Sequence, residues 1–293
     1  MYKLRDIKPK YSKIEVLDFK SNHDFMDAYV ELLKDSIECL YNIVYLKYFN
    51  ENDTPKKITR DDAIVGGNLV RLIKLNISFL ENVCNGKTEI CLIINRCLAE
   101  TYINLKYLLI NGEDNVKRNY IKNSLITEKE LWNVIKENIN SREEDVLNIE
   151  KRMQISIGNS FEKSDFDIED INKSSKWKSI KNRAESIAGD QFYSVFYGIA
   201  SHSIHGNWQD ILTNNLKKID EGFMLNLSWY EPKPQLMDTA IIFNIDILKV
   251  YIEIEFENHK YTDQFKKNYN TLLIYVRTLN KLHEEFLQKE NNL

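Results

Sequence analysis

The sequence predicts an all-α protein, a bundle of long helices with at most one short β-hairpin near residues 223–230. Glycine and proline are scarce, with 9 and 4 among 293 residues, whereas sheet-rich folds need many such turn residues. Apolar residues recur every three or four positions over long stretches, which is typical of one buried helix face. Several of these stretches open with Ser or Thr followed three residues later by an acid, a helix-capping pattern.

The first third of the chain is expected to hold an arm and two long helices. Residues 1–20 mix basic and acidic side chains without apolar periodicity, which favours an extended, solvated arm. Helices are predicted over about 21–49 and 59–85, each with a capping pattern at its start. Gly66 and Gly67 lie inside the second helix, where each costs about 1 kcal/mol relative to Ala. Close packing by another helix would offset that cost.

The most apolar helix is expected over about residues 88–111, and it should be central and buried because it is apolar on most faces. Arg96 and Glu100 interrupt it four residues apart, and Asn104 continues the polar stripe one turn later. Charged side chains are rarely fully buried unless they are paired. The stripe therefore either faces water or contributes to an internal polar site.

The middle of the chain is more polar. Shorter, exposed helices are expected over 113–158, with capping boxes at Thr127 and Ser141. Residues 159–175 are strongly acidic and favour a flexible loop rather than a cation site, because they lack the glycine and final Glu of a calcium loop. We treat residues 21–293 as a single helical domain that contains this loop.

The last third returns to helices. One helix should run from Trp177 to about Gly189, and a short extended segment or hairpin over 223–230 is the only β candidate. Proline at 232 and 234 would end that segment. Two long helices with three-four apolar spacing are expected over about 235–258 and 262–290.

One stretch, residues 189–210, stands out because its polar side chains are regularly spaced. Positions four apart share one face of a helix, and four polar residues have this spacing: Tyr193, Tyr197, Ser201 and His205. Gly206 follows, and glycine directly after a helix readily adopts the left-handed conformation that ends it. We therefore expect a helix that ends at His205.

Composition narrows the setting of the protein. The net charge is −4, so there is no global nucleic-acid footprint, although a local basic groove is compatible with it. The four cysteines form no Cys-x-x-Cys pair and lie in apolar patterns, which favours buried thiols in a reducing compartment. No secretory signal and no run of 18 apolar residues is present. We expect a cytoplasmic protein without a membrane partner, and the abundance of Lys, Asn and Ile favours a bacterial source.

Two motifs together resemble a known family. The pairs Arg96-x3-Glu100 and Tyr197-x3-Ser201-x3-His205-Gly206 resemble a broad bacterial family of all-helical proteins whose function is unknown, and Trp177 fits the same layout. The resemblance covers roughly residues 25–250 and implies a helical fold without a known activity.

A more distant likeness is to the HEPN class of helical ribonucleases, which are common in toxin–antitoxin and phage-defence systems. Those proteins carry an Arg several residues before a His near the end of a helix, often with Gly after it. His205-Gly206 is similar to that ending, but Ile199, Ala200 and Ser201 stand where the Arg is expected. Under this likeness Arg96, from another helix, would have to supply the cation.

The candidate catalytic residues are His205, Arg96, Glu100 and Ser201. Histidine titrates near neutral pH and suits general base catalysis, and a guanidinium can stabilise the charge that develops on a phosphate. Candidate substrate contacts are Tyr197, Asn104 and His202. Neither a metal nor a cofactor is expected: His202 and His205 have the spacing of metal ligands, with Glu100 or Asp210 as a carboxylate, but no signature third ligand accompanies them.

Two functions from different classes stay open. The first is a helical effector of a bacterial defence or toxin-like system, either a HEPN-like ribonuclease or an enzyme acting on nucleotides, with metal-independent phosphodiester cleavage. The second is a non-enzymatic binding or scaffold protein, in which Arg96, Glu100, Ser201 and His205 form a structural network between helices. Partners to consider are RNA or a nucleotide, a protein from the same operon, and a second copy of the chain as a homodimer.

Overall fold

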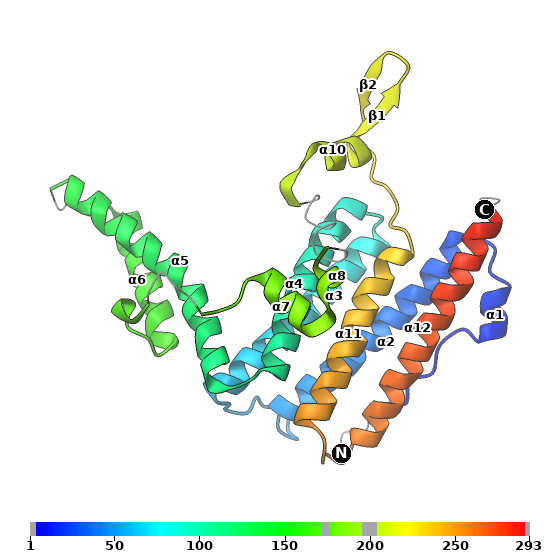
Figure 1. Cartoon of the computed structure of the whole chain (residues 1–293), viewed down its shortest axis with the longest axis horizontal. Coiled ribbons are helices and arrows are strands. Elements are labelled where there is room, and N and C mark those ends of the chain that lie inside the picture. The colour runs from blue at the N-terminus through cyan, green and yellow to red at the C-terminus, as the bar shows by residue number, and fades with distance from the viewer. Residues whose placement is uncertain (1–3, 144, 172–175, 195–203, 291–293) are drawn as a thin grey trace. The chain divides into compact units, whose positions relative to one another are not determined.

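The computed structural model describes residues 4–143, 145–171, 176–194 and 204–290. Within these residues the fold is all-α apart from one two-stranded antiparallel hairpin, which confirms the predicted fold class (Figure 1). Three of the predicted site residues, Tyr197, Ser201 and His202, lie outside the described residues.

The chain forms two compact units rather than the single helical domain expected over residues 21–293. The first unit joins Met1–Ile110 to Arg183–Leu293, and the second comprises Asn111–Asn182. Helical periodicity alone does not reveal such an insertion, because it describes each helix without its packing partners.

Long helices build the first unit: α2 (Asn22–Tyr48), α3 (Arg60–Cys84), α4 (Thr88–Ile110), α11 (Gln235–Glu255) and α12 (Thr262–Glu290). Helix α4 packs against α3 on one side and α11 on the other, and α2 packs against α3, α11 and α12. The central, buried position expected for the most apolar helix is confirmed by its many inaccessible side chains.

The predicted caps at the start of α2 and α3 are confirmed. The Ser21 hydroxyl accepts a hydrogen bond from the Asp24 amide, and the Thr59 hydroxyl accepts one from the Asp62 amide at 3.1 Å. These bonds satisfy amide groups that have no partner inside the helix. Gly86 (φ +67°) follows the end of α3 in the left-handed conformation expected for a terminating glycine.

A buried polar network fixes the register of the helices in the first unit. Asn76 and Asn244 exchange side-chain hydrogen bonds of 2.9 and 3.1 Å, and Asn244 also donates to the Ser36 hydroxyl at 3.0 Å. All three residues are inaccessible to solvent. Because an unpaired buried amide costs about 1–3 kcal/mol, sliding α2, α3 or α11 along its axis is disfavoured.

The N-terminal arm is mostly exposed over its described residues, as expected, but it is not extended throughout and it is docked on the helices. Leu4, Ile7 and Val16 are buried, and Ser12 caps a short helix, α1 (Lys13–Leu17). Most of this segment lacks the apolar periodicity of a helix, but its few apolar side chains still pack against the helices.

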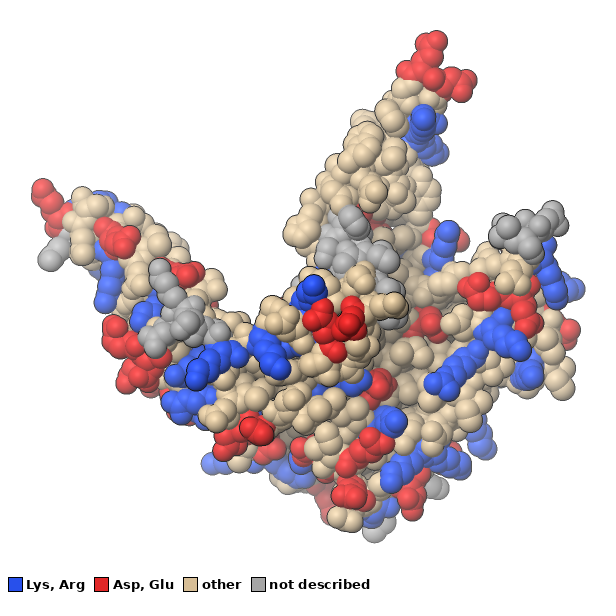
Figure 2. Space-filling view, viewed as in Figure 1, with Lys and Arg blue, Asp and Glu red and all other residues tan. Residues whose placement is uncertain are grey.

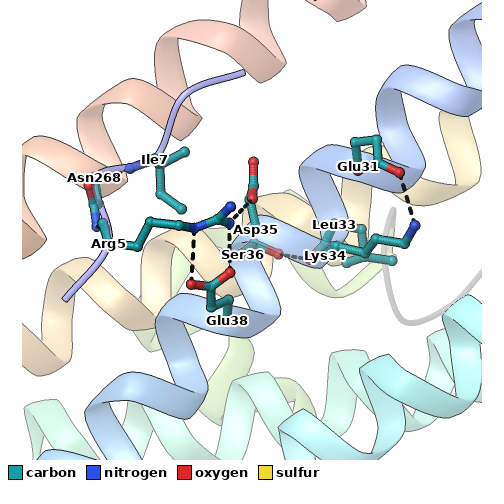
Figure 3. A network of polar contacts seen from close by, with 9 residues as sticks. All are labelled: Arg5, Ile7, Glu31, Leu33, Lys34, Asp35, Ser36, Glu38 and Asn268. Carbon is teal, nitrogen blue, oxygen red and sulfur yellow. Dashed lines mark hydrogen bonds and ion pairs between the residues drawn. The ribbon is translucent and has the colours of Figure 1, made fainter. Parts of the chain in front are cut away.

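Hydrogen bonds dock this N-terminal segment on α12. The Ile7 amide donates to Asn268 Oδ1 at 3.0 Å, and Asn268 Nδ2 donates to the Arg5 carbonyl at 2.9 Å (Figure 3). The Arg5 guanidinium turns the other way and pairs with Asp35 and Glu38 of α2. The segment therefore ties the first long helix of the unit to the last.

The second unit contains α5 (Asp114–Ser141), α6 (Asn148–Lys163) and a short 3-10 helix, η1 (Ile168–Asp170). The expected capping boxes at Thr127 and Ser141 are wrong, since Thr127 lies inside α5 and Ser141 is its last residue. Both positions have the residue types of a capping box. Helix α5 nevertheless continues through Thr127, because the helix propensity of the surrounding residues is uninterrupted.

The acidic segment is also more ordered than expected over its described part. Residues 159–163 belong to α6, and Phe166 and Ile171 enter the core of the second unit. That core is formed by buried apolar side chains: Leu125, Ile135, Ile139, Ile157, Phe161, Phe166 and Ile171. Three widely spaced apolar residues anchor the segment although its charge suggests a solvated loop.

The chain re-enters the first unit through shorter elements: α7 (Ile180–Ala188), α8 (Asp190–Phe192), α10 (Trp208–Asn214), β1 (Leu216–Ile219) and β2 (Gly222–Leu225). The predicted hairpin is present but begins at Leu216, earlier than residue 223. Leu216 pairs with Leu225 and Ile219 with Gly222, which leaves a two-residue turn.

Helix α3 is long and apolar enough to cross a membrane when judged by length and composition alone. Core helices meet the same criterion, and α3 packs against α2 and α4.

The cysteines differ in exposure. Cys39 and Cys91 are buried, which raises the pKa of each thiol to about 12, whereas Cys84 is exposed. The expectation of buried thiols therefore fails at Cys84.

Candidate functional site

The polar stripe of α4 begins with an ion pair. Arg96 Nη1 lies 3.1 Å from Glu100 Oε2, which confirms the pairing suggested by their spacing. The Arg96 side chain is only 9% exposed, whereas that of Glu100 is 49% exposed. The pair thus stands at the edge of the helix core, with its cation inside and its carboxylate at the solvent rim.

Burial lowers the pKa of Arg96, because desolvation disfavours the charged form, while Glu100 and then Tyr193 act in the opposite direction. A guanidinium stays protonated in proteins despite such effects. Arg96 is therefore a fixed positive charge in a poorly hydrated position, where its interaction with an anion is stronger than in water.

The segment after α7 begins beside this charge. Phe192 packs on Tyr102 of α4 and Phe243 of α11, with ring centroids 5.6 and 6.0 Å away. The next residue, Tyr193, lies near enough to Arg96 to influence its pKa. The ring contacts of Phe192 thus hold the start of the 193–205 stretch against α4 and α11.

Residues that sequence reasoning missed hold α4 in place. The Tyr102 hydroxyl donates to Asp246 of α11 at 2.7 Å, and Lys106 Nζ lies 2.7 Å from the same carboxylate. The Tyr102 ring stacks on Phe243 with centroids 4.3 Å apart. This contact fixes the rotation of α4 against α11, and hence the direction in which Arg96 projects. The signal was the four-residue spacing of Tyr102 and Lys106, together with Asp246 in the middle of the apolar α11.

Asn104 lies one turn after Glu100, as the stripe requires. Its Oδ1 is buried and has no hydrogen-bond partner among the described residues. A buried carbonyl oxygen without a donor is costly. Asn104 therefore offers an acceptor that a donor group could satisfy.

His205 is the last helical residue before Gly206, whose φ of +54° confirms the predicted helix end. The side chain of His205 is exposed. The described contacts do not connect it to Arg96. Of the predicted site residues, the structure brings together Arg96 and Glu100, with Asn104 one turn further along α4.

A metal site has no support among the residues that the structure describes, because no group of three or more His, Cys, Asp or Glu side chains is placed to hold an ion. Asp210, one of the acids considered for such a site, instead receives hydrogen bonds from Asn214 Nδ2 at 3.0 Å. Its role here is to support α10.

Comparison with known proteins gives one match. A search of curated proteins and a search of solved structures find no significant relative. A family model, described as a family of unknown function (DUF5677), matches residues 62–223. The match spans more than half of the chain and contains both α4 and the stretch that ends at His205-Gly206. The protein therefore belongs to DUF5677, a family of unknown function.

Proposed function

We propose that the protein is an effector of a bacterial defence or toxin-like system that cleaves RNA, or a nucleotide phosphodiester, without a metal, in the manner of HEPN ribonucleases. The observation that carries the proposal is the Arg96 guanidinium, whose side chain is 9% exposed and which pairs with Glu100 at the solvent rim of α4. Tyr193 opens the polar line that leads twelve residues later to His205, so both motifs belong to one unit of the chain. The likeness in the His205-Gly206 ending supplies the reaction class.

The Arg96–Glu100 pair suits phosphate binding. An ion pair at the solvent rim is worth about 0–1 kcal/mol, so a phosphate oxygen can replace Glu100 as the partner of Arg96. The guanidinium then stabilises the charge that develops on the phosphoryl oxygens, an effect worth about 10²–10³-fold in rate. Glu100 keeps the guanidinium oriented when no phosphate is bound.

In the proposed reaction, His205 accepts the proton of the ribose 2′-hydroxyl. The 2′-oxygen forms a bond to phosphorus, the bond from phosphorus to the 5′-oxygen breaks, and the 5′-oxygen takes up a proton. The products are a 2′,3′-cyclic phosphate and a 5′-hydroxyl end. Ser201 would donate to the phosphate, while Tyr197, His202 and Asn104 would contact the nucleotide. The unpartnered Oδ1 of Asn104 can accept a hydrogen bond from a base or sugar.

The test compares cleavage of single-stranded RNA, with EDTA present, by wild type and His205→Ala. General acid–base catalysis contributes about 10²–10⁴-fold, so we expect a loss in that range and cyclic phosphate ends on the wild-type products. His23→Ala is the matched control, because His23 is also exposed and lies in the first turn of α2. Equal rates for wild type and His205→Ala, including no cleavage by either, would contradict the proposal.

The alternative is a scaffold in which the polar cluster only fixes helix packing, and the burial of Arg96 favours it. Truncating a nearly buried arginine side chain removes its packing against the neighbouring side chains. In this case Arg96→Ala should lower the melting temperature of a protein that has no nuclease activity. His205→Ala should leave the melting temperature unchanged, because His205 is exposed and strands no buried partner. That outcome would select the scaffold over the enzyme.

A further inference from the structure

The segment Asn207–Tyr230, which we call the hairpin arm, exposes an unusual number of large apolar side chains. The two most exposed are at the end of β2 and just after it, Leu225 at 81% and Leu227 at 96%, and Met224 of β2 is 56% exposed. Others follow the same segment, and all are at least 36% exposed: Trp208, Ile211, Leu212, Ile219, Phe223, Trp229 and Tyr230. Single exposed apolar residues are normal on a surface, but a concentration of them marks an interaction site.

The base of the hairpin arm is held by hydrogen bonds to α4, so the apolar side chains of the arm are exposed on an anchored segment. Asn215 Nδ2 donates to Glu89 of α4 at 2.8 Å, and the Thr88 amide donates to the Tyr230 carbonyl at 3.2 Å. Within the arm, Trp208 packs edge-to-face on Phe223, with ring centroids 5.6 Å apart. The first unit therefore holds the arm at both ends while leaving its apolar side chains uncovered.

The two edges of the hairpin differ in charge. The β1 edge carries Lys217 and Lys218, a common protection against strand pairing, whereas β2 contains no charged residue. Figure 2, drawn from the same side as Figure 1, shows basic side chains along the β1 side of the hairpin and uncharged surface along the β2 side. An added strand is therefore accepted on β2 and repelled on β1.

Among the residues that the structure describes, no strand other than β1 pairs with β2, so its outer edge is open. The Asn226 amide donates to the Asn215 carbonyl at 2.8 Å, so Asn226 faces β1. Backbone groups alternate in direction along an antiparallel strand. Phe223 and Leu225 therefore direct their amide and carbonyl groups away from β1. Two strands alone are marginally stable in water, and a third strand or a packed face is needed.

We propose that the β2 edge binds the β2 edge of a second copy of this chain, which makes a four-stranded antiparallel sheet across a twofold axis. Antiparallel pairing of a strand with itself satisfies twofold symmetry, in which the same patch serves both partners. The exposed apolar surface of the arm is about 1,000 Å², from the exposed fractions above and about 200 Å² for a large side chain. A stable interface needs about 800 Å² from each partner.

The charges of the arm favour a protein partner over a lipid surface. Asp220 and Glu221 form the turn at the tip, where Figure 2 shows acidic side chains. They offset Lys217 and Lys218, so the hairpin offers anionic lipid no net attraction. A carboxylate at the tip also opposes insertion into an apolar layer. The proposal does not depend on the enzymatic function suggested above.

The test is the mass of the full-length protein in solution, measured by light scattering after gel filtration at about 10 µM. We expect twice the 34.7 kDa mass of one chain. Leu225→Pro should shift the protein to the monomer and weaken association at least tenfold, because proline removes an amide that faces the partner. Lys218→Pro is the matched control: Lys218 also faces away from the hairpin, but on the β1 edge, so this variant should stay dimeric.

A second variant tests whether loss of the dimer in Leu225→Pro reflects only a misfolded hairpin. Leu225→Glu with Leu227→Glu leaves the backbone intact and should also give monomers, while Ile274→Glu, on the exposed face of α12 at 67% exposure, should not. Circular dichroism should show native helix content in all variants. A monomeric wild type, or dimers that survive both β2 changes, would overturn the proposal. So would a monomeric wild type that binds neutral lipid vesicles through the arm.

Discussion

Asp238 shows how one half-buried carboxyl group can oppose folding. It lies in the first turn of α11, and burial raises the pKa of its carboxyl to about 6. A carboxyl group whose pKa is raised in the folded state binds more protons there than in the unfolded chain. Stability therefore falls as the pH rises from about 4 to about 6, and the loss persists at pH 7.

We predict that Asp238→Asn raises the free energy of unfolding at pH 7 by about 1–3 kcal/mol, since one pKa unit corresponds to about 1.4 kcal/mol. The gain should shrink toward pH 4, where Asp238 is already protonated. Urea unfolding at several pH values measures this. Asp263→Asn, at the exposed first turn of α12, should not stabilise the protein. A gain for Asp238→Asn that does not depend on pH would contradict the assignment.

At the scale of elements, the contact between α2 and α3 depends on one of two adjacent glycines. A Cβ placed on Gly66 would lie 2.9 Å from the Tyr48 ring, while a Cβ on Gly67 would meet nothing within 4 Å. Tyr48 is buried, and its hydroxyl lies 3.0 Å from that of Tyr251. The ring therefore has little freedom to move away.

We predict opposite outcomes for the two alanine substitutions. Gly67→Ala should stabilise the protein by about 0.5–1 kcal/mol, the usual gain of helix propensity. In Gly66→Ala that gain is offset by overpacking, which typically costs about 1–3 kcal/mol. Thermal unfolding of the two variants should therefore place Gly66→Ala below Gly67→Ala. Equal melting temperatures would show that the Tyr48 ring relaxes freely.

The elements also show what the sequence can predict. The three-four spacing and the Ser21 and Thr59 caps located α2, α3, α4, α11 and α12, because helix formation is local. The partners of polar residues are not local. Nothing in the spacing joins Asn76 to Asn244, or Tyr102 to Asp246, since each pair is more than 140 residues apart. The Arg96–Glu100 pair was predictable because both residues lie on one helix.

At the scale of the whole molecule, the division into two units was not predictable from helix patterns. The second unit has a core of its own, in which Phe161 is 3% exposed. A unit of about 70 residues buries only a modest fraction of the surface that its unfolded chain exposes, so its stability is marginal. The site was predicted only in part for a related reason: periodicity placed His205 on a helix face but did not reveal that its side chain is exposed.

We predict that Phe161→Ala destabilises the second unit by about 3–5 kcal/mol, the usual cost of removing a buried phenyl ring. Hydrogen exchange read by mass spectrometry should speed up in α5 and α6 while α2, α4 and α11 keep their protection. Ile155→Ala, on the same helix at 64% exposure, is the control and should change neither. Faster exchange in both units would mean that they unfold together.

The docking of Leu4–Ile7 on α12 has a consequence for synthesis. Leu4 and Ile7 complete these hydrogen bonds with residues 260 and 261 positions later in the chain, and α2 likewise waits for α11 and α12. On the ribosome the apolar sides of α2 and α4 that pack against α11, and the side of α2 that packs against α12, stay uncovered until those two helices emerge. A translation stall in that region would leave a nascent chain with exposed apolar surface, which is prone to aggregate and would need chaperones.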